Sequence, residues 1–274
     1  MHLATVGADP ELAIMQGRNF CQARMFVERV DGHTYEPWGQ VGRDGAHDGP
    51  LEIRPKPSFK PPEVVGNLGN LLAAAQTLIG PVSTLFVGSR APAIGGIGGH
   101  LHAWGRKQTR DNLHNAHNRC RICVGLSLLW SLEDYEQGCQ RRHHGYGGVN
   151  DIRRGEPTYE FRSPSSDWLA SPTLANACLY YFQALADGLG KYGQNIDDVD
   201  TILEQSEIYW KTELSRSGRE KYQQSVVNLV KAVVRPKDLN TILFFSGKLA
   251  GLREEHKLIR IDAEKWKKKA ATLE

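Results

Sequence analysis

Gly98-Gly99-His100-Leu101-His102 places two histidines two positions apart, directly after two glycines. Residues two apart in a β-strand point to the same face of the sheet, so the two imidazoles are expected to share a face. The glycines let the backbone bend or approach a ligand closely. Imidazoles bind transition-type divalent ions and also join carboxylates in Mg²⁺ or Mn²⁺ sites. For this segment alone, two solvated histidines on an edge strand are an equally weighted alternative.

Three further segments repeat this two-residue spacing with charged side chains. They are Asp9-Pro10-Glu11, Leu51-Glu52-Ile53-Arg54 and Glu160-Phe161-Arg162. Carboxylates, imidazoles and arginines on one sheet face would make a costly core but a good site for divalent metal and phosphate. The planar arginine fork suits phosphate oxygens. A solvated strand edge or a surface ion pair would explain each segment taken singly.

A basic run mixes arginine and histidine with glycine. It reads Arg141-Arg142-His143-His144-Gly145-Tyr146-Gly147-Gly148-Val149-Asn150-Asp151-Ile152-Arg153. Cationic side chains between glycines are typical of a loop that surrounds phosphate. A mobile basic surface loop is the commoner explanation of such runs.

A different metal site is suggested by His114, His117, Cys120 and Cys123, which follow one another at steps of three. In a helix each such step turns the side chain by about −60°, so the first and last point in nearly opposite directions. Four ligands then cannot converge on one zinc ion, and this pattern does not favour a structural zinc site.

Composition excludes several classes of protein. The chain has 274 residues, 40% apolar and 24% charged, with a formal charge of +3. The mild positive charge does not favour a nucleic-acid partner, because the basic residues do not form one long tract. Five cysteines and no N-terminal signal sequence indicate free thiols in the cytoplasm. No apolar run approaches the roughly 20 residues of a membrane span. The sequence has neither a phosphate-binding Gly-x-x-x-x-Gly-Lys-Ser/Thr loop nor a Gly-x-Ser-x-Gly elbow.

Hydrophobic patterning predicts strands first and helices later. Strands are expected at 3–14, 21–30, 51–54, 84–87, 100–104 and 157–162, with a turn at Asp31-Gly32 and loops at 36–50 and 138–150. Helices are expected at 63–79, 111–132, within 167–188 after the cap Ser171 and Pro172, at 197–234 with a break near Ser217-Gly218, and at 250–271. This order predicts an α+β fold, with an antiparallel or mixed sheet and helices packed against it. We expect one domain over residues 1–274, with a motif-bearing sheet region at 1–168 and a mostly helical region at 169–274.

Together these motifs resemble the carboxylate–amine ligases of the glutamine synthetase/glutamate–cysteine ligase superfamily. More narrowly, the chain resembles the phage-associated COOH-NH2 ligase (amidoligase) group. The matching segments are Gly7–Leu12, His47–Pro55, Gly98–His102, Tyr146–Arg153 and Tyr159–Pro164. They lie within residues 7–168, and the residues from 190 onward carry no matching motif.

The resemblance implies a glutamine-synthetase-like fold, in which a curved antiparallel or mixed sheet carries helices on one face. It also implies ATP and Mg²⁺ or Mn²⁺ as cofactors. The implied metal ligands are Glu11, Glu52, His100, Glu160 and, as a fifth, Asp9. The implied nucleotide-binding residues are His102, Arg54, Arg142 and Arg162. Arg162, Arg153 and Glu160 would form the catalytic centre, with both arginines on the transferring phosphoryl group.

The reaction implied is ATP-dependent formation of an amide bond through an acyl phosphate. Its partners would be a carboxylate and an amine, each a small molecule or a peptide or protein terminus, in the cytoplasm of the host if a phage encodes the chain. A homo-oligomer stays open. Two other functions stay open as well: a catalytically inactive phage assembly or binding protein on the same fold, and a metal-dependent hydrolase.

Overall fold

The computed structural model describes residues 4–27, 39–43, 49–105, 107–155, 158–188 and 215–273. Within them, the main feature is a nine-stranded sheet built around the long strand β1 (Ala4–Gln16). The sheet has the strand order β11 (Ile259–Ile261), β5 (Ser83–Val87), β1, β8 (Gly99–Gly105), β10 (Thr158–Phe161) and β9 (Ile152–Gly155). Beside this path, β1 also pairs with β2 (Asn19–Cys21) and β4 (Leu51–Arg54), and β4 pairs with β3 (Gln40–Arg43). Every pairing in this sheet is antiparallel. A two-stranded ribbon of β6 (Arg90–Ala91) and β7 (Gly95–Gly96) lies between β5 and β8 in the chain.

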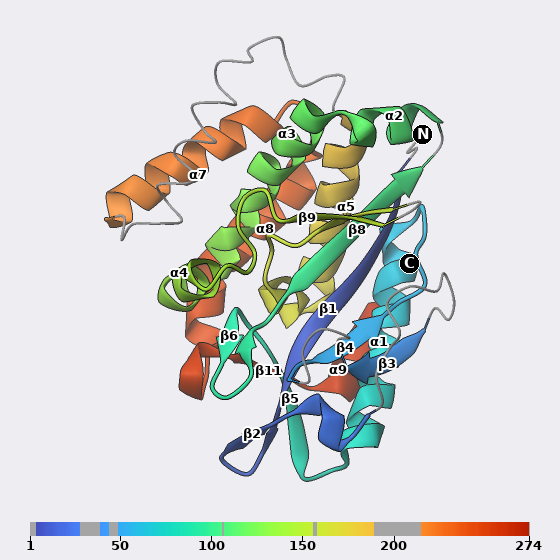
Figure 1. Cartoon of the computed structure of the whole chain (residues 1–274), viewed down its shortest axis with the longest axis vertical. Helices are drawn as coiled ribbons and strands as arrows, with labels where there is room; N and C mark the ends of the chain where they lie inside the picture. The colour runs from blue at the N-terminus through green and yellow to red at the C-terminus, as the bar shows by residue number, and fades with distance from the viewer. Residues whose placement is uncertain are drawn as a thin grey trace.

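Helices cover one face of this sheet, as the sequence predicts (Figure 1). They are α1 (Pro61–Ile79), α5 (Pro172–Gly188) and α9 (Ala263–Ala270). Val6, Leu101 and Phe161 are completely buried, and the ring of Phe161 meets that of Phe182 in α5 at a centroid distance of 5.5 Å. Alternation along each strand therefore sends the apolar side chains to the helices and the polar ones to the opposite face. The α+β class and the predominantly antiparallel sheet are confirmed.

The remaining helical segments surround this core. They are η1 (Ala23–Met25), α2 (Lys107–His114), α3 (Ala116–Leu126), η2 (Ser127–Leu132), α4 (Tyr135–His143), η3 (Ser166–Ala170), α7 (Arg216–Val230), α8 (Pro236–Lys248), η5 (Leu249–Leu252) and η6 (Glu255–Lys257). The predicted start of α5 is confirmed, because Pro172 is its first residue and the Ser171 hydroxyl accepts a hydrogen bond from the backbone N–H of Leu174 at 3.2 Å. Among the helices that the structure describes, none is long and apolar enough to cross a membrane.

Several predicted elements in the first two thirds of the chain are wrong. The strand expected at 21–30 ends at Cys21 and gives way to η1, while the loop expected at 36–50 contains β3. The helix expected at 111–132 is divided at Asn115, whose side chain caps α3. The loop expected at 138–150 begins as the end of α4, because Asp134 caps that helix and it continues to His143. The Asp31-Gly32 turn and residues 44–48 lie outside the described residues.

The C-terminal region differs more. Ser215 caps α7, so a helix begins at Arg216, next to the break expected near Ser217-Gly218. In place of one helix at 250–271, the chain forms strand β11 beside β5 and begins α9 only after the cap Asp262. Helix α8 is not predicted at all, and residues 189–214 lie outside the described part of the chain.

Candidate metal and phosphate site

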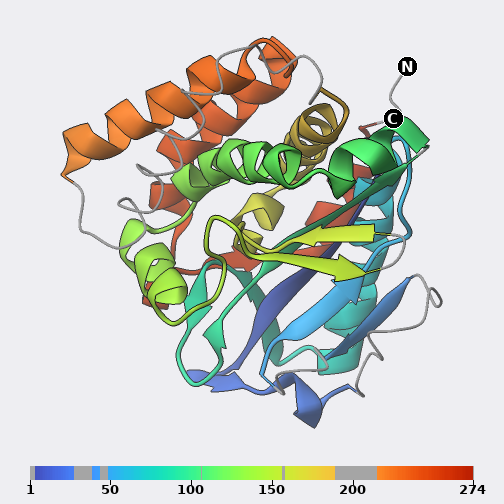
Figure 2. The same ribbon diagram turned by 45° about the horizontal axis from the view of Figure 1, so that its top comes forward.

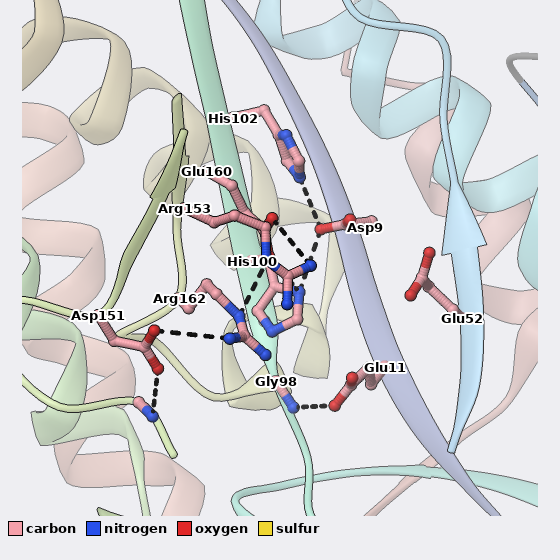
Figure 3. A network of polar contacts seen from close by, with 12 residues as sticks. Asp9, Glu11, Glu52, Gly98, His100, His102, Asp151, Arg153, Glu160 and Arg162 are labelled. Atoms are coloured by element: carbon pink, nitrogen blue, oxygen red, sulfur yellow. Dashed lines mark hydrogen bonds and ion pairs between the residues drawn. The ribbon is translucent and has the colours of Figure 1, made fainter. Parts of the chain in front are cut away.

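The polar side chains predicted to share a face do lie together on the sheet face opposite α1 and α5 (Figure 3). Antiparallel pairing places Asp9 opposite His100, Glu11 opposite Glu52, and His102 opposite Glu160. Residues paired directly across two strands project to the same side of the sheet. Arg54 follows Glu52 by two positions and Arg162 follows Glu160 by two, so both arginines project to this face as well. The structure thus brings together residues that are up to about 150 positions apart in the sequence.

The centre of this face is a three-residue cluster of Asp9, His100 and Glu160. Their candidate ligand atoms all lie within 4.8 Å of one another. His100 Nδ1 is 3.3 Å from Asp9 Oδ1 and 3.4 Å from Glu160 Oε1. Among the described residues this is the only group of three or more histidine, cysteine or carboxylate side chains with such geometry. Oxygen ligands with one imidazole suit a hard divalent cation such as Mg²⁺ or Mn²⁺.

Tyr146 and Glu11 fix the orientation of the His100 ring. The Tyr146 hydroxyl donates to Glu11 Oε1 at 3.0 Å and lies 2.5 Å from His100 Nε2, from which it accepts. The other Glu11 oxygen accepts the backbone N–H of Gly98 at 2.5 Å. A Cβ at Gly98 would overlap both His100 Nε2 and the Tyr146 hydroxyl, which explains the glycine before the histidines. Nδ1 of His100 is therefore aimed at Asp9 and Glu160.

His100 and Asp9 stabilise each other's charge. Burial alone would lower the pKa of His100, but Asp9, Glu11 and Glu160 raise it to about 9. Burial would likewise raise the pKa of Asp9, yet His102 and His100 hold it well below its usual range. His102 Nε2 lies 2.8 Å from the same Asp9 oxygen. Both effects follow from placing opposite charges a few ångströms apart away from water.

Glu52 is a buried carboxylate with two acidic neighbours. Burial and the neighbouring Asp9 and Glu11 raise its pKa to about 8, although Arg54 donates to it and opposes the shift. Like charges directly opposite each other on a sheet are destabilising. A divalent cation beside Glu11 and Glu52 would remove this cost.

Cationic side chains lie above the buried carboxylates. Glu11, Glu52, His100 and Glu160 are buried, whereas Arg153 is 57% exposed and Arg162 is 16% exposed. Arg162 Nε lies 3.2 Å and Arg153 Nη1 lies 3.6 Å from the two Glu160 oxygens. Asp151 fixes Arg162 from the other side at 3.6 Å. This arrangement, with arginines nearer the solvent and carboxylates buried beneath them, suits a phosphate group that the arginines contact while the carboxylates hold metal ions.

The prediction that Arg142 binds the nucleotide is wrong. It lies in α4, fully buried, where Nη1 donates to Glu133 at 2.5 Å and the guanidinium stacks on Trp130 at 4.4 Å. Its charge is matched inside the protein, so it supports the fold and is not placed to bind a nucleotide. The neighbouring Arg141 is also buried and donates to the carbonyls of Arg162, Ser163 and Pro164.

Sequence reasoning missed two residues of this site, Tyr146 and Asp151. Each lies in the basic run and in the segment Tyr146–Arg153 that carries the family resemblance, but no spacing ties either residue to the histidines. In the structure, the Tyr146 ring lies between Arg141 and Arg162, at 4.5 and 4.8 Å from their guanidinium carbons. Asp151 also accepts the N–H of Gly147 at 2.8 Å, so it holds the loop and Arg162 together.

With this geometry in view, comparisons with known proteins are informative. The family described as phage phiEco32-like COOH.NH2 ligase-type 2 matches residues 6–232. The chain belongs to this family. The match covers every candidate residue of the face and ends two residues after α7, so α8, β11 and α9 lie beyond it.

Among solved structures, the chain is similar to a bifunctional glutathione synthetase from Pasteurella multocida, with a TM-score of 0.51 and 11% sequence identity. The similarity covers 98% of this chain and 52% of that one, so the chain spans about half the length of its neighbour. At this identity the likeness concerns the fold alone, and the glutamine-synthetase-like form of the fold stays a prediction. A search of curated proteins gave no match.

Proposed function

We propose that this member of the COOH.NH2 ligase family joins a carboxylate to an amine with ATP, through an acyl phosphate, at the sheet face around His100. The observation that carries the proposal is the cluster of Asp9, His100 and Glu160, with ligand atoms within 4.8 Å, beneath Arg153 and Arg162. Family membership supports the ligase class, and the layering of acids under cations supports phosphate chemistry.

The residues present fit a divalent cation. Four carboxylates, Asp9, Glu11, Glu52 and Glu160, meet on this face, and burial together with the neighbouring Asp9 and Glu11 raises the pKa of Glu52. Asp9, His100 and Glu160 would hold one Mg²⁺ or Mn²⁺, with Glu11 and Glu52 beside them. When bound, the metal would neutralise phosphate oxygens and orient the reacting groups.

In the proposed reaction, an oxygen of the substrate carboxylate attacks the γ-phosphorus of ATP and ADP leaves. The amine nitrogen then attacks the acyl carbon, loses a proton, and inorganic phosphate leaves as the amide forms. Phosphoryl transfer depends on positioning and charge neutralisation more than on a protein nucleophile. Arg162 and Arg153 would neutralise the transferring phosphoryl group while Glu160 holds both guanidinium groups in place. His102 and Arg54, which are also partly exposed beside the cluster, would contact the nucleotide.

Thermal unfolding with nucleotide and metal tests the binding step. Wild-type protein with ATP or ADP at 100 times its Kd and fixed Mn²⁺ should gain about 2.7 kcal/mol. His100→Ala should lose this gain, because it removes the only imidazole of the cluster. No gain for wild type with any nucleotide or metal would contradict the proposal and favour a binding protein on the same fold.

Turnover tests the chemistry. Glu160→Gln should abolish ATP hydrolysis linked to any accepted carboxylate and amine, while circular dichroism stays as in wild type. The matched control is Glu220→Gln, the same change at an exposed residue of α7, which should leave turnover unaltered. Retained turnover in Glu160→Gln would contradict the assignment of Glu160 to the catalytic centre. Metal-dependent cleavage of a substrate without ATP would instead indicate a hydrolase.

A further inference from the structure

A cavity of about 590 Å³ lies on the opposite face of β9 and β10 from the metal cluster. It is lined from α2 and α3 on one side and from the two strands on the other, which lie close together in Figure 2. Its polar lining consists of His114, Arg119, Cys120, Asn150, Arg154 and Tyr159. Cavities of 300–1,000 Å³ are typical of small-molecule sites.

The strand register separates this cavity from the proposed catalytic face. Arg154 pairs with Tyr159, and the next pair is Arg153 with Glu160. Neighbouring residues of a strand point to opposite faces, so Arg154 and Tyr159 face α3 while Arg153 and Glu160 face the metal cluster. The cavity is therefore a different site on the same two strands.

The chemistry of the lining is basic. Two arginines and a histidine contribute to it, and none of its lining residues in the described part of the chain is acidic. Arg119 is fixed in place, since Nη1 donates to the carbonyls of Leu113 and His114 at 2.8 Å each and the guanidinium lies 5.3 Å from the Tyr159 ring centroid. In the described part of the chain, no acceptor meets Nε or Nη2 of Arg119. A fixed guanidinium with unused donors suits a planar or tetrahedral anion.

Polar groups beside the arginines are also ordered. His114 Nδ1 and the Tyr159 hydroxyl lie 2.5 Å apart, and Tyr159 is buried. This pair and the Asn150 amide add further hydrogen-bonding groups to the lining. Such a wall matches a ligand with an anionic end and further polar groups.

We infer that this cavity binds a small molecule bearing a carboxylate or a phosphate, held by Arg119 and Arg154. The inference does not depend on ATP chemistry at the metal cluster. It has a consequence for that cluster, however, because a ligand held against Arg154 and Tyr159 would fix the strands that carry Arg153 and Glu160.

Two cysteines allow occupancy to be measured without any activity. Cys120 lines the cavity and Cys139 lies in α4 outside it, both partly buried, while Cys21, Cys123 and Cys178 are buried. Alkylation by neutral iodoacetamide, followed by peptide mass spectrometry, gives the rate at each thiol. Inorganic phosphate or succinate at ten times its Kd should slow Cys120 roughly tenfold and leave Cys139 unchanged. Sodium chloride at equal ionic strength should protect neither, and comparison of the two anions separates phosphate from carboxylate ligands.

Variants locate the protecting site. Arg119→Gln and Arg154→Gln should each abolish protection, and Arg154→Gln keeps the test valid if loss of the Arg119 hydrogen bonds disturbs α2. Arg121→Gln removes the same charge from α3 outside the cavity lining and should retain protection. His100→Ala should retain it as well, because the metal cluster is a separate site.

A second measurement needs no variant. Iodoacetate carries its own carboxylate, so its rate relative to iodoacetamide should be roughly tenfold higher at Cys120 than at Cys139 if the cavity concentrates anions. Equal ratios at the two thiols together with unprotected Cys120 would overturn the inference. Protection that disappears in His100→Ala but survives in Arg154→Gln would also overturn it, by assigning the anion to the metal face.

Discussion

Tyr146→Phe tests how far the Tyr146 hydroxyl positions His100, because it leaves the other residues of the site unchanged. The change removes one oxygen, which is 2.5 Å from His100 Nε2 and 3.0 Å from Glu11 Oε1, and keeps the ring between Arg141 and Arg162. Burial and the adjacent Glu11 raise the pKa of this tyrosine well above its ordinary value, so the hydroxyl is neutral and donates to Glu11. The variant therefore leaves a buried imidazole N–H and a carboxylate oxygen without this partner.

The expected size of the effect follows from those two bonds. A hydrogen bond to a charged group contributes about 1.5–3 kcal/mol, and the two here share one hydroxyl, so we expect a loss of about 2–4 kcal/mol. For a chain of this length that corresponds to a decrease in Tm of roughly 5–10 °C. Loss of a residue that orients a metal ligand typically weakens metal binding by about 10- to 100-fold.

Calorimetric titration with Mn²⁺ and thermal unfolding together test this reasoning. Tyr181→Phe is the matched control, because its buried hydroxyl donates to the Gly125 carbonyl at 2.6 Å within the helical layer. The control should lose stability but keep its Mn²⁺ affinity, whereas Tyr146→Phe should lose both. Unchanged Mn²⁺ affinity in Tyr146→Phe would refute the proposed orientation of His100.

Three further predictions concern neighbouring features. Gly98→Ala should weaken Mn²⁺ binding by about tenfold or more in the same titration, because its Cβ would overlap His100 Nε2; wild-type affinity would contradict this. Arg142→Met leaves Glu133 buried without its cationic partner and should cost roughly 3–5 kcal/mol in urea unfolding, with nucleotide affinity retained in the folded fraction; a loss of affinity at unchanged stability would restore Arg142 to the site. Metal-free protein should lose stability as pH rises above about 6. His100 stabilises the fold fully below its ordinary pKa of 6.5, and this contribution is lost as pH rises through its folded pKa of about 9. Glu52 adds to the loss up to about pH 8, because burial holds its carboxyl protonated in the fold while the same group is ionised in the unfolded chain. Tm measured from pH 6 to 9 should decline without Mn²⁺ and stay level with it, and a flat metal-free profile would contradict the assignment of these shifts.

The sequence predicts this face well because its signal is local. Asp9 with Glu11, His100 with His102, and Glu160 with Arg162 each lie two apart on a strand, and that spacing alone sets them on one side. Which strands pair is a long-range property, yet any register that buries Val6, Leu101 and Phe161 against the helices turns these side chains the other way. The polar face is therefore largely determined once the apolar face is recognised.

The predictions from sequence fail where tertiary packing outweighs the local sequence pattern. Arg142 lies in a stretch whose glycines and histidines indicate a loop, but α4 extends into it and turns the guanidinium toward Glu133 and Trp130. Tyr146 reaches His100 across a sequence separation of 46 residues, which no spacing encodes. The three residues of β11 lie inside a longer amphipathic pattern, and only the free edge of β5 makes them a strand.

The late position of β11 and α9 in the chain has a consequence for biosynthesis. β11 completes the sheet beside β5, and α9 packs so closely on α1 that a Cβ at Gly69 would approach Lys267 Cα to 3.1 Å. Strands β1, β8 and β10 leave the ribosome long before residues 259–270, and at typical translation rates the interval is about 5–20 s. Throughout that interval the edge of β5 and the outer surface of α1 are uncovered, which makes the nascent chain a substrate for strand-pairing aggregation or for chaperone capture. Yield of folded protein should therefore depend on how quickly these last residues are made.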